Sequence, residues 1–188
     1  MGQLLMCREA APLAPSVLPE GYTLHTFYRD GKNDVSLAWF REEWTRVVTP
    51  DIPVPFENYY DDDRIPADGI YYITGPEGNL VATATVQLNV HEDGTGTVHM
   101  VAADPAHRGK GLGSAVSAAV TAHCDRIGLP RTYLTTDEWR PHAVILYRKL
   151  GFVPVIYEDG EKERWDKMLS SLGLEICPYI YPTREIRA

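Results

Sequence analysis

Hydrophobic residues recur with two different periods along the chain, and each period predicts a kind of element. In residues 80–90 one face carries only Leu, Ala and Val, while most alternate positions are Thr, Gln or Asn. This period of two is typical of a β-strand. In residues 34–48 the apolar positions lie three or four apart and predict a helix with one apolar stripe. That stripe consists of Leu37, Phe40, Trp44 and Val47.

The first half of the chain is predicted to be mainly short strands. Segments 75–79 and 91–96 are rich in Gly, Pro, Asn and Asp and predict turns, so the strands that they join form an antiparallel meander. The predicted strands are 21–28, 70–74, 80–90 and 97–102. Residues 56–64 are predicted to be a short helix or a loop.

After this meander, helices and strands alternate. The pattern predicts helices at 111–127, 141–150 and 161–172, strands at 132–136 and 152–157, and a closing strand around Tyr179, Ile180 and Tyr181. The order strand, helix, strand indicates that 97–102 and 132–136 run parallel. We therefore expect an α/β fold with a mixed sheet. Residues 1–19 are predicted to be a flexible arm, and residues 20–188 a single domain.

Composition narrows the classes of function. The 188 residues include 18 Lys and Arg against 26 Asp and Glu, and this net charge of −8 argues against nucleic-acid or anionic-membrane partners. No window approaches the ~20 apolar residues that span a bilayer, and residues 1–19 lack a signal-peptide pattern. Cys7, Cys124 and Cys177 are far apart and odd in number. We expect no metal, a core position for Cys124 and a reducing cytoplasm.

The segment 108–114, Arg-Gly-Lys-Gly-Leu-Gly-Ser, lies between a predicted strand and a long predicted helix. A helix N-terminus presents unpaired N–H groups and partial positive charge, and glycine lets a phosphate come close to the backbone. Arg108 and Lys110 add charge, and Ser114 adds a hydroxyl donor. The segment therefore predicts a pyrophosphate site.

Spacing tests other interpretations of this segment. A Walker loop needs Ser or Thr directly after Gly-Lys, but Gly111 follows Lys110. A dinucleotide fingerprint needs Gly-x-Gly-x-x-Gly at the start of a βαβ unit, whereas the third glycine here comes one position early and after a meander. A tight turn that binds no ligand remains an alternative.

Two motifs in this region resemble those of the GNAT acyltransferases. Arg108, Gly111 and Gly113 fill that family's coenzyme A motif, and residues 143–152, Ala-Val-Ile-Leu-Tyr-Arg-Lys-Leu-Gly-Phe, resemble its second motif. The motifs occur in the family's order with one strand between them. The resemblance covers residues 70–155.

The resemblance implies a GNAT-like fold in which the fourth and fifth strands splay apart and hold coenzyme A. It implies an enzyme that moves an acetyl group from acetyl-CoA to a primary amine of a small molecule, or to a peptide N-terminus, by direct attack in a ternary complex. The backbone of Val101, Ala102 and Ala103 would hold the pantetheine arm. The pyrophosphate would contact Arg108, Gly109, Lys110, Gly111, Leu112, Gly113 and Ser114.

Acyl transfer needs a proton for the leaving thiolate and a donor to the carbonyl oxygen. The resemblance assigns the first role to Tyr147, which also contacts the cofactor, and the second to the backbone N–H of Val101. His99 is a candidate base that relays the amine's proton through water. It lies two residues before Val101, so both side chains share a strand face unless a bulge intervenes.

The sequence departs from the family's pattern at two positions. Thr135 stands where family members often carry a glutamate, so Asp137, Glu138 or no base at all remain alternatives to His99. Arg140 stands where the family often has an asparagine that contacts pantetheine. It is predicted to contact a coenzyme A phosphate or a substrate carboxylate, and a residue that simply starts the helix is the alternative.

The identity of the acceptor stays open. Tyr59, Tyr60 and the aspartates at 61–63 could form an aromatic, acidic rim for an ammonium group, or a solvated loop. Three other functions are alternatives: a non-catalytic acyl-CoA-binding module, a nucleotide-binding protein and a structural protein. A homodimer is one option for the assembly.

Overall fold

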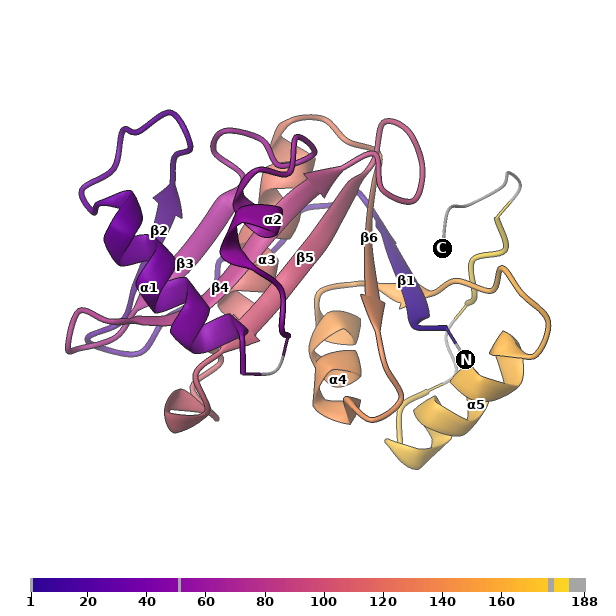
Figure 1. Cartoon of the computed structure of the whole chain (residues 1–188). Coiled ribbons are helices and arrows are strands. Elements are labelled where there is room, and N and C mark those ends of the chain that lie inside the picture. The colour runs from indigo at the N-terminus through magenta and orange to yellow at the C-terminus, as the bar shows by residue number, and fades with distance from the viewer. Residues whose placement is uncertain (1, 51, 176–177, 183–188) are drawn as a thin grey trace.

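The computed structural model describes residues 2–50, 52–175 and 178–182. In this part of the chain seven strands form one sheet in the order β2-β3-β4-β5-β6-β1-β7, and only β5 and β6 pair in parallel (Figure 1). The strands are β1 (Leu4–Glu9), β2 (Thr23–Phe27), β3 (Ile70–Thr74), β4 (Leu80–Leu88), β5 (Gly96–Ala103), β6 (Arg131–Thr136) and β7 (Val153–Pro154). The helices are α1 (Leu37–Val48), α2 (Phe56–Tyr60), the short 3₁₀ helix η1 (Pro105–His107), α3 (Leu112–Arg126), α4 (Pro141–Lys149) and α5 (Glu161–Ser171).

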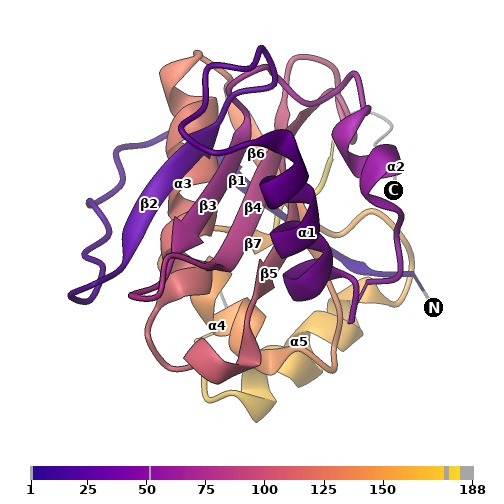
Figure 2. The same ribbon diagram turned by 60° about the vertical axis from the view of Figure 1, so that its left-hand side comes forward.

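Helices cover both faces of the meander. Figures 1 and 2 show α1 on one face of β3 and β4 and α3 on the opposite face. The α1 side holds an aromatic cluster, and the α3 side holds an aliphatic cluster that also includes residues of α4 and α5. Because both faces are covered, the polar positions of β4 are buried too, and the Thr85 hydroxyl pairs with Tyr59 at 2.6 Å.

Helix α1 begins at Leu37, later than the start at residue 34 that the sequence predicts. The Ser36 hydroxyl accepts a hydrogen bond from the Trp39 N–H at 3.1 Å and caps the helix there. Phe40, Trp44 and Val47 are buried as expected, but Leu37 in the first turn is 46% exposed. Across the described residues, no helix has the length and apolarity needed to cross a membrane.

The prediction that residues 1–19 form a flexible arm is wrong for Leu4–Glu9. This segment is β1, which lies between β6 and β7 and pairs with both in antiparallel fashion. Four consecutive apolar residues, Leu4, Leu5, Met6 and Cys7, are at most 1% exposed. A continuous apolar run of this length is typical of a strand that is buried on both faces.

The C-terminal segment contains less strand than its pattern predicts. The strand expected at 152–157 is reduced to β7, and Ile180 makes only an isolated parallel bridge to Val155. Cys124 is fully buried in the core, as predicted, and a side chain at Gly96 would meet its sulfur at 2.4 Å. Cys177 lies outside the described residues.

Strands β5 and β6 separate soon after they pair. Their ladder contains only Gly96–Thr132 and Thr97–Tyr133, and Figure 1 shows the two strands diverging from that end. The register between β4 and β5 shifts between Thr83 and Thr85, and Met100 on β5 has φ 52°. These features mark a β-bulge, which bends a strand and redirects its side chains. The expected splay is therefore present.

Candidate active site

The N-terminus of α3 is open. Its N-cap, Gly111, is in the left-handed region with φ 74°, makes no side-chain cap and is followed by no acidic residue in the first turn. The Ala115 N–H donates to the Gly111 carbonyl at 3.0 Å, so the N–H groups of Leu112, Gly113 and Ser114 precede the first turn's hydrogen bonds. Free N–H groups at the positive end of a helix dipole favour an anion.

A cavity of about 320 Å³ brings the two sequence motifs together. Its described lining comes from the end of β5, the glycine loop and α4. It carries three cationic side chains, two imidazoles and no carboxylate. The lining residues are Ala103, His107, Arg108, Gly109, Lys110, Gly111, Leu112, Gly113, Ser114, His142, Ile145, Leu146 and Lys149.

The α4 part of this lining escaped the sequence analysis. His142, Ile145, Leu146 and Lys149 lie three, one and three positions apart, which places them on one helical face. The spacing is present in the sequence, but the apolar residues between the two basic ends indicate a core-facing stripe and not a ligand site.

Tyr147 lies on α4 but outside this lining. The side chain is 7% exposed, and its ring packs edge-on against Phe152 with centroids 6.1 Å apart. Burial raises the pKa of its hydroxyl to about 12, although the Arg140 guanidinium opposes the shift. Within the described residues the hydroxyl has no hydrogen-bond partner, and it is not among the fully enclosed polar atoms. It is a protonated group available to a ligand.

Arg140 lies two turns before Tyr147, as the N-cap residue of α4. Its guanidinium lies over the Trp139 ring at 4.3 Å and 3.6 Å from the Asp137 carboxylate. It is not part of the cavity lining. The Arg140 guanidinium is close enough to Tyr147 to oppose the rise of its pKa, and the predicted contact with a coenzyme A phosphate or a substrate carboxylate stays a prediction.

The edge of β5 that faces the splay is open after Thr97. Within the described chain, Val101, Ala102 and Ala103 have no partner in β6, while Ala102 and Ala103 pair with β4 on the other side. An unpaired strand edge presents backbone N–H and C=O groups to any extended ligand. This edge of β5 is therefore open to an extended ligand.

The bulge separates His99 from Val101. Val101 packs with the aliphatic cluster on the α3 side, while His99 lies opposite Thr85, whose hydroxyl binds Tyr59 of α2. Directly opposed residues share a sheet face, so His99 faces the α1–α2 side. The exception that the sequence analysis allowed for therefore applies: the extra residue of the bulge reverses the alternation, so the two side chains lie on opposite faces.

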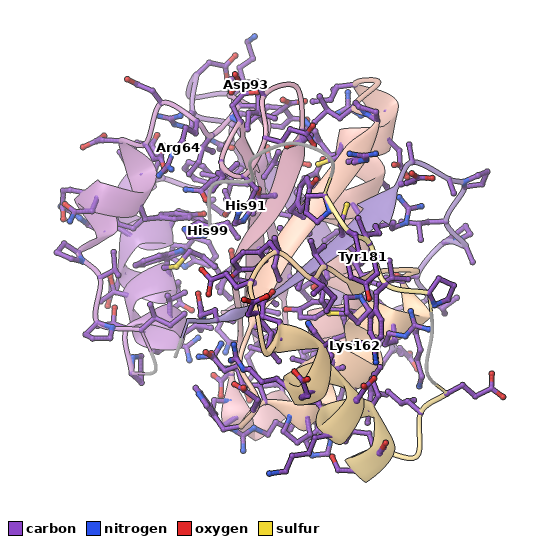
Figure 3. All side chains as sticks on the ribbon, turned by 90° about the vertical axis from the view of Figure 1, so that its right-hand side faces the viewer. Arg64, His91, Asp93, His99, Lys162 and Tyr181 are labelled. Atoms are coloured by element: carbon purple, nitrogen blue, oxygen red, sulfur yellow. The ribbon has the colours of Figure 1, made fainter. Side chains whose placement is uncertain are left out.

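His99 is a half-buried, neutral imidazole. Desolvation lowers its pKa to about 4, while Asp62 opposes and Arg64 reinforces this shift. In Figure 3, Arg64, His91 and His99 lie in one region between the α1–α2 side and Tyr181 of the C-terminal segment. His99 therefore carries a free electron pair at neutral pH.

The other candidates for a base or an acceptor rim are engaged elsewhere. Glu138 accepts a hydrogen bond from Arg164 at 2.6 Å, which lowers its pKa. Burial disfavours the charge of Asp62, but hydrogen bonds from Arg64 outweigh it and lower the pKa to about 2. Tyr59 is 3% exposed and belongs to the core, so it forms no rim. Thr135 is exposed on β6.

Comparison with known proteins decides the family. Residues 36–152 match the model of the Acetyltransferase (GNAT) family, a span that contains both motifs. The chain belongs to this family. GNAT membership is consistent with the splayed strands and with the open helix N-terminus beside them.

A GNAT relative named mycothiol acetyltransferase, from Salinispora arenicola, is 34% identical over 155 residues, which are 76% of this chain and 48% of the relative. A GCN5-related N-acetyltransferase from Kribbella flavida has a similar structure, with TM-score 0.55 and 25% identity over 81% of this chain and 54% of that one. A second such structure, from Sphaerobacter thermophilus, gives TM-score 0.63 at 20% identity, with coverage of 80% and 47%. The chain spans about half the length of the curated relatives it matches.

Proposed function

We propose that this chain transfers an acetyl group from acetyl-CoA to a primary amine of a small molecule. One observation carries the proposal: the 320 Å³ cavity joins the open N-terminus of α3 to a basic stripe of α4, directly beside the splay. The relatives named mycothiol acetyltransferase support a small-molecule acceptor.

The cavity fits the charge of coenzyme A. Acetyl-CoA would supply an acyl group as a reactive thioester and bring a pyrophosphate with it. The N–H groups of Leu112, Gly113 and Ser114 would hold that pyrophosphate, and Arg108 and Lys110 would neutralise it. The pantetheine arm would follow the open edge of β5.

Tyr147 would serve as the acid. A free thiol has a pKa near ~8.5, so the departing thiolate takes up a proton at neutral pH, and a donor held near it would supply that proton. The Tyr147 hydroxyl stays protonated because its pKa is about 12, and it has no competing partner within the described residues. The positive Arg140 guanidinium would favour negative charge on the Tyr147 oxygen. The Val101 N–H would donate to the carbonyl oxygen.

The acceptor amine would approach from the α1–α2 side, where His99 lies. An unprotonated imidazole can accept the amine's proton through water. With a pKa of about 4 it is a weak base, so His99 would pass the proton to solvent rather than retain it. Thr135 lacks a basic group and cannot accept the amine's proton. Either His99 would accept it, or the fraction of amine that is already neutral would react.

Calorimetric titration with acetyl-CoA tests the proposal, with NAD and ATP as controls. We expect binding of acetyl-CoA alone in the micromolar range. Thiol release is then followed over a panel of amines that includes an unacetylated mycothiol. Binding of NAD or ATP in place of acetyl-CoA would overturn the proposal. Binding of acetyl-CoA without turnover of any amine would favour a non-catalytic acyl-CoA-binding module.

A further inference from the structure

A tyrosine outside both motifs contacts the glycine loop. Tyr22 precedes β2, and its hydroxyl lies 2.8 Å from Nδ1 of His107. The two rings meet edge-on with centroids 5.7 Å apart and planes at 80°. The Lys110 ammonium lies 5.7 Å from the centroid of the Tyr22 ring, within the range of a cation–π contact. Tyr22 therefore touches two of the nitrogen-bearing side chains that line the cavity.

The Tyr22–His107 contact determines which nitrogen of His107 faces a ligand. The Tyr22 hydroxyl can donate to Nδ1, and in that arrangement the proton of a neutral imidazole resides on Nε2. Within the described residues Nε2 has no hydrogen-bond partner, and His107 lines the cavity. An N–H donor in a cavity that has no carboxylate in its described lining suits an anionic oxygen.

His107 is anchored at the end of a capped turn. It ends η1, whose first turn is capped by Asp104, which accepts from the Ala106 N–H at 2.9 Å. Arg46 donates to the same carboxylate at 2.6 Å. Gly109 and Gly111 follow with φ of 77° and 74°, a left-handed conformation that glycine adopts without steric cost. An anchored donor therefore stands directly before the glycine loop.

We propose that His107 donates a hydrogen bond from Nε2 to the cofactor's phosphates, and that Tyr22 is a positioning residue that fixes its tautomer and orientation. This inference rests on the proposed function, since it needs acetyl-CoA in the cavity. It extends the binding site beyond the glycine motif to a segment before β2.

A double-mutant cycle on the full chain tests this pair. Calorimetry with acetyl-CoA compares the wild type, Tyr22→Phe, His107→Phe and the double variant. Loss of a donor to a charged group should raise the Kd about tenfold in His107→Phe, and loss of the orienting hydroxyl should raise it about threefold in Tyr22→Phe. The double variant should bind no more weakly than His107→Phe, because Tyr22 acts through His107.

Two controls separate a phosphate contact from general damage. Pantetheine, which lacks the phosphates and is titrated at millimolar concentration, should bind all four proteins equally. Tyr28→Phe, an exposed tyrosine just beyond the other end of β2, should leave the Kd for acetyl-CoA unchanged. If His107→Phe does not fold, His107→Ala replaces it, since the residue is only half-buried on a surface turn.

The outcomes distinguish this inference from the proposed function. Failure of the wild type to bind acetyl-CoA overturns the function and the inference together. Tight binding by the wild type with an unchanged Kd in His107→Phe overturns the inference alone. Additive effects in the double variant would show that Tyr22 does not act through His107, and an equal loss of pantetheine binding would show that the phosphates are not involved.

Discussion

The two sides of the splay between β5 and β6 are built in different ways. On the proposed cofactor side, the end of β5, residues 107–114 and one face of α4 supply the described lining, and backbone N–H groups would supply much of the chemistry. On the proposed acceptor side, His99 comes from β5, Arg64 from the segment after α2, and Thr135 from β6. The proposed cofactor side centres on one glycine loop and depends on backbone geometry, whereas the proposed acceptor side depends on side chains that only the fold brings together.

The strongest test of this difference is Gly111→Glu. It places a carboxylate at the helix N-terminus where a pyrophosphate is expected, so affinity for acetyl-CoA should fall more than about 100-fold by calorimetry. A non-glycine residue at φ 74° also costs about 1–2 kcal/mol. Gly128→Glu, at φ 79° beyond the other end of α3, carries the same strain and should bind normally. Equal loss in both variants would contradict the cofactor site.

Tyr147→Phe tests whether the cofactor side also supplies the acid. We expect turnover to fall about 100-fold, because a general acid contributes on that scale, while the KM for acetyl-CoA changes less than about twofold. Tyr157→Phe is the matched control, because burial also raises the pKa of Tyr157 to about 12 and the residue packs with a different cluster. Unchanged turnover in Tyr147→Phe would leave this residue a packing role only.

His99→Gln probes the acceptor side through pH. Desolvation lowers the folded-state pKa of His99 to about 4 from 6.5, so the unfolded chain binds the proton more readily. The stability that depends on a neutral His99 is present above pH 6.5 and is lost as the pH falls toward 4. Between these values the wild type should lose about 3 kcal/mol more than His99→Gln in urea titrations.

His25 and His123 also have lowered pKa values, mainly through burial. Because both residues are present in the wild type and in the variant, their contributions cancel in the difference between the two unfolding free energies. Parallel stability curves for the two proteins would mean that His99 is solvated. If His99 relays the amine's proton, kcat at neutral pH should also fall about tenfold in the variant.

The smallest effect is expected for Gly113→Ala. A methyl group there would meet Leu146 Cδ1 at 3.7 Å, an ordinary contact, and Gly113 is not among the glycines with positive φ. The Kd for acetyl-CoA should change less than about twofold by calorimetry. A large loss would show that the cofactor approaches the helix more closely at Gly113 than the surrounding side chains indicate.

The sequence predicted the position of the glycine loop because the parts of that loop are adjacent in the chain. Glycines, a helix start and a strand end lie next to each other in residues 101–114, so periodicity and turn chemistry were enough to place the loop. The helix stripe from His142 to Lys149 was missed because basic residues at the ends of an apolar stripe do not reveal what the stripe faces. Its partner loop is distant in sequence.

The acceptor side and the N-terminal strand were harder to predict. A single bulge at Met100 moved His99 to the other face, and alternation alone cannot locate an extra residue. The apolar run from Leu4 to Cys7 was passed over because it is short and its strand partners follow much later in the chain. The bulge is a local irregularity that periodicity does not encode, whereas the position of β1 depends on contacts with segments far along the chain.

The position of β1 has a consequence for synthesis of the protein. This strand is synthesised well before its two neighbours, β6 and β7, which begin at Arg131 and Val153. The β2–β5 meander and α3 can form earlier, because their contacts lie within one continuous stretch. Until β6 emerges, the apolar run of β1 has no strand partner in the sheet, so the nascent chain carries an exposed, aggregation-prone segment over that interval.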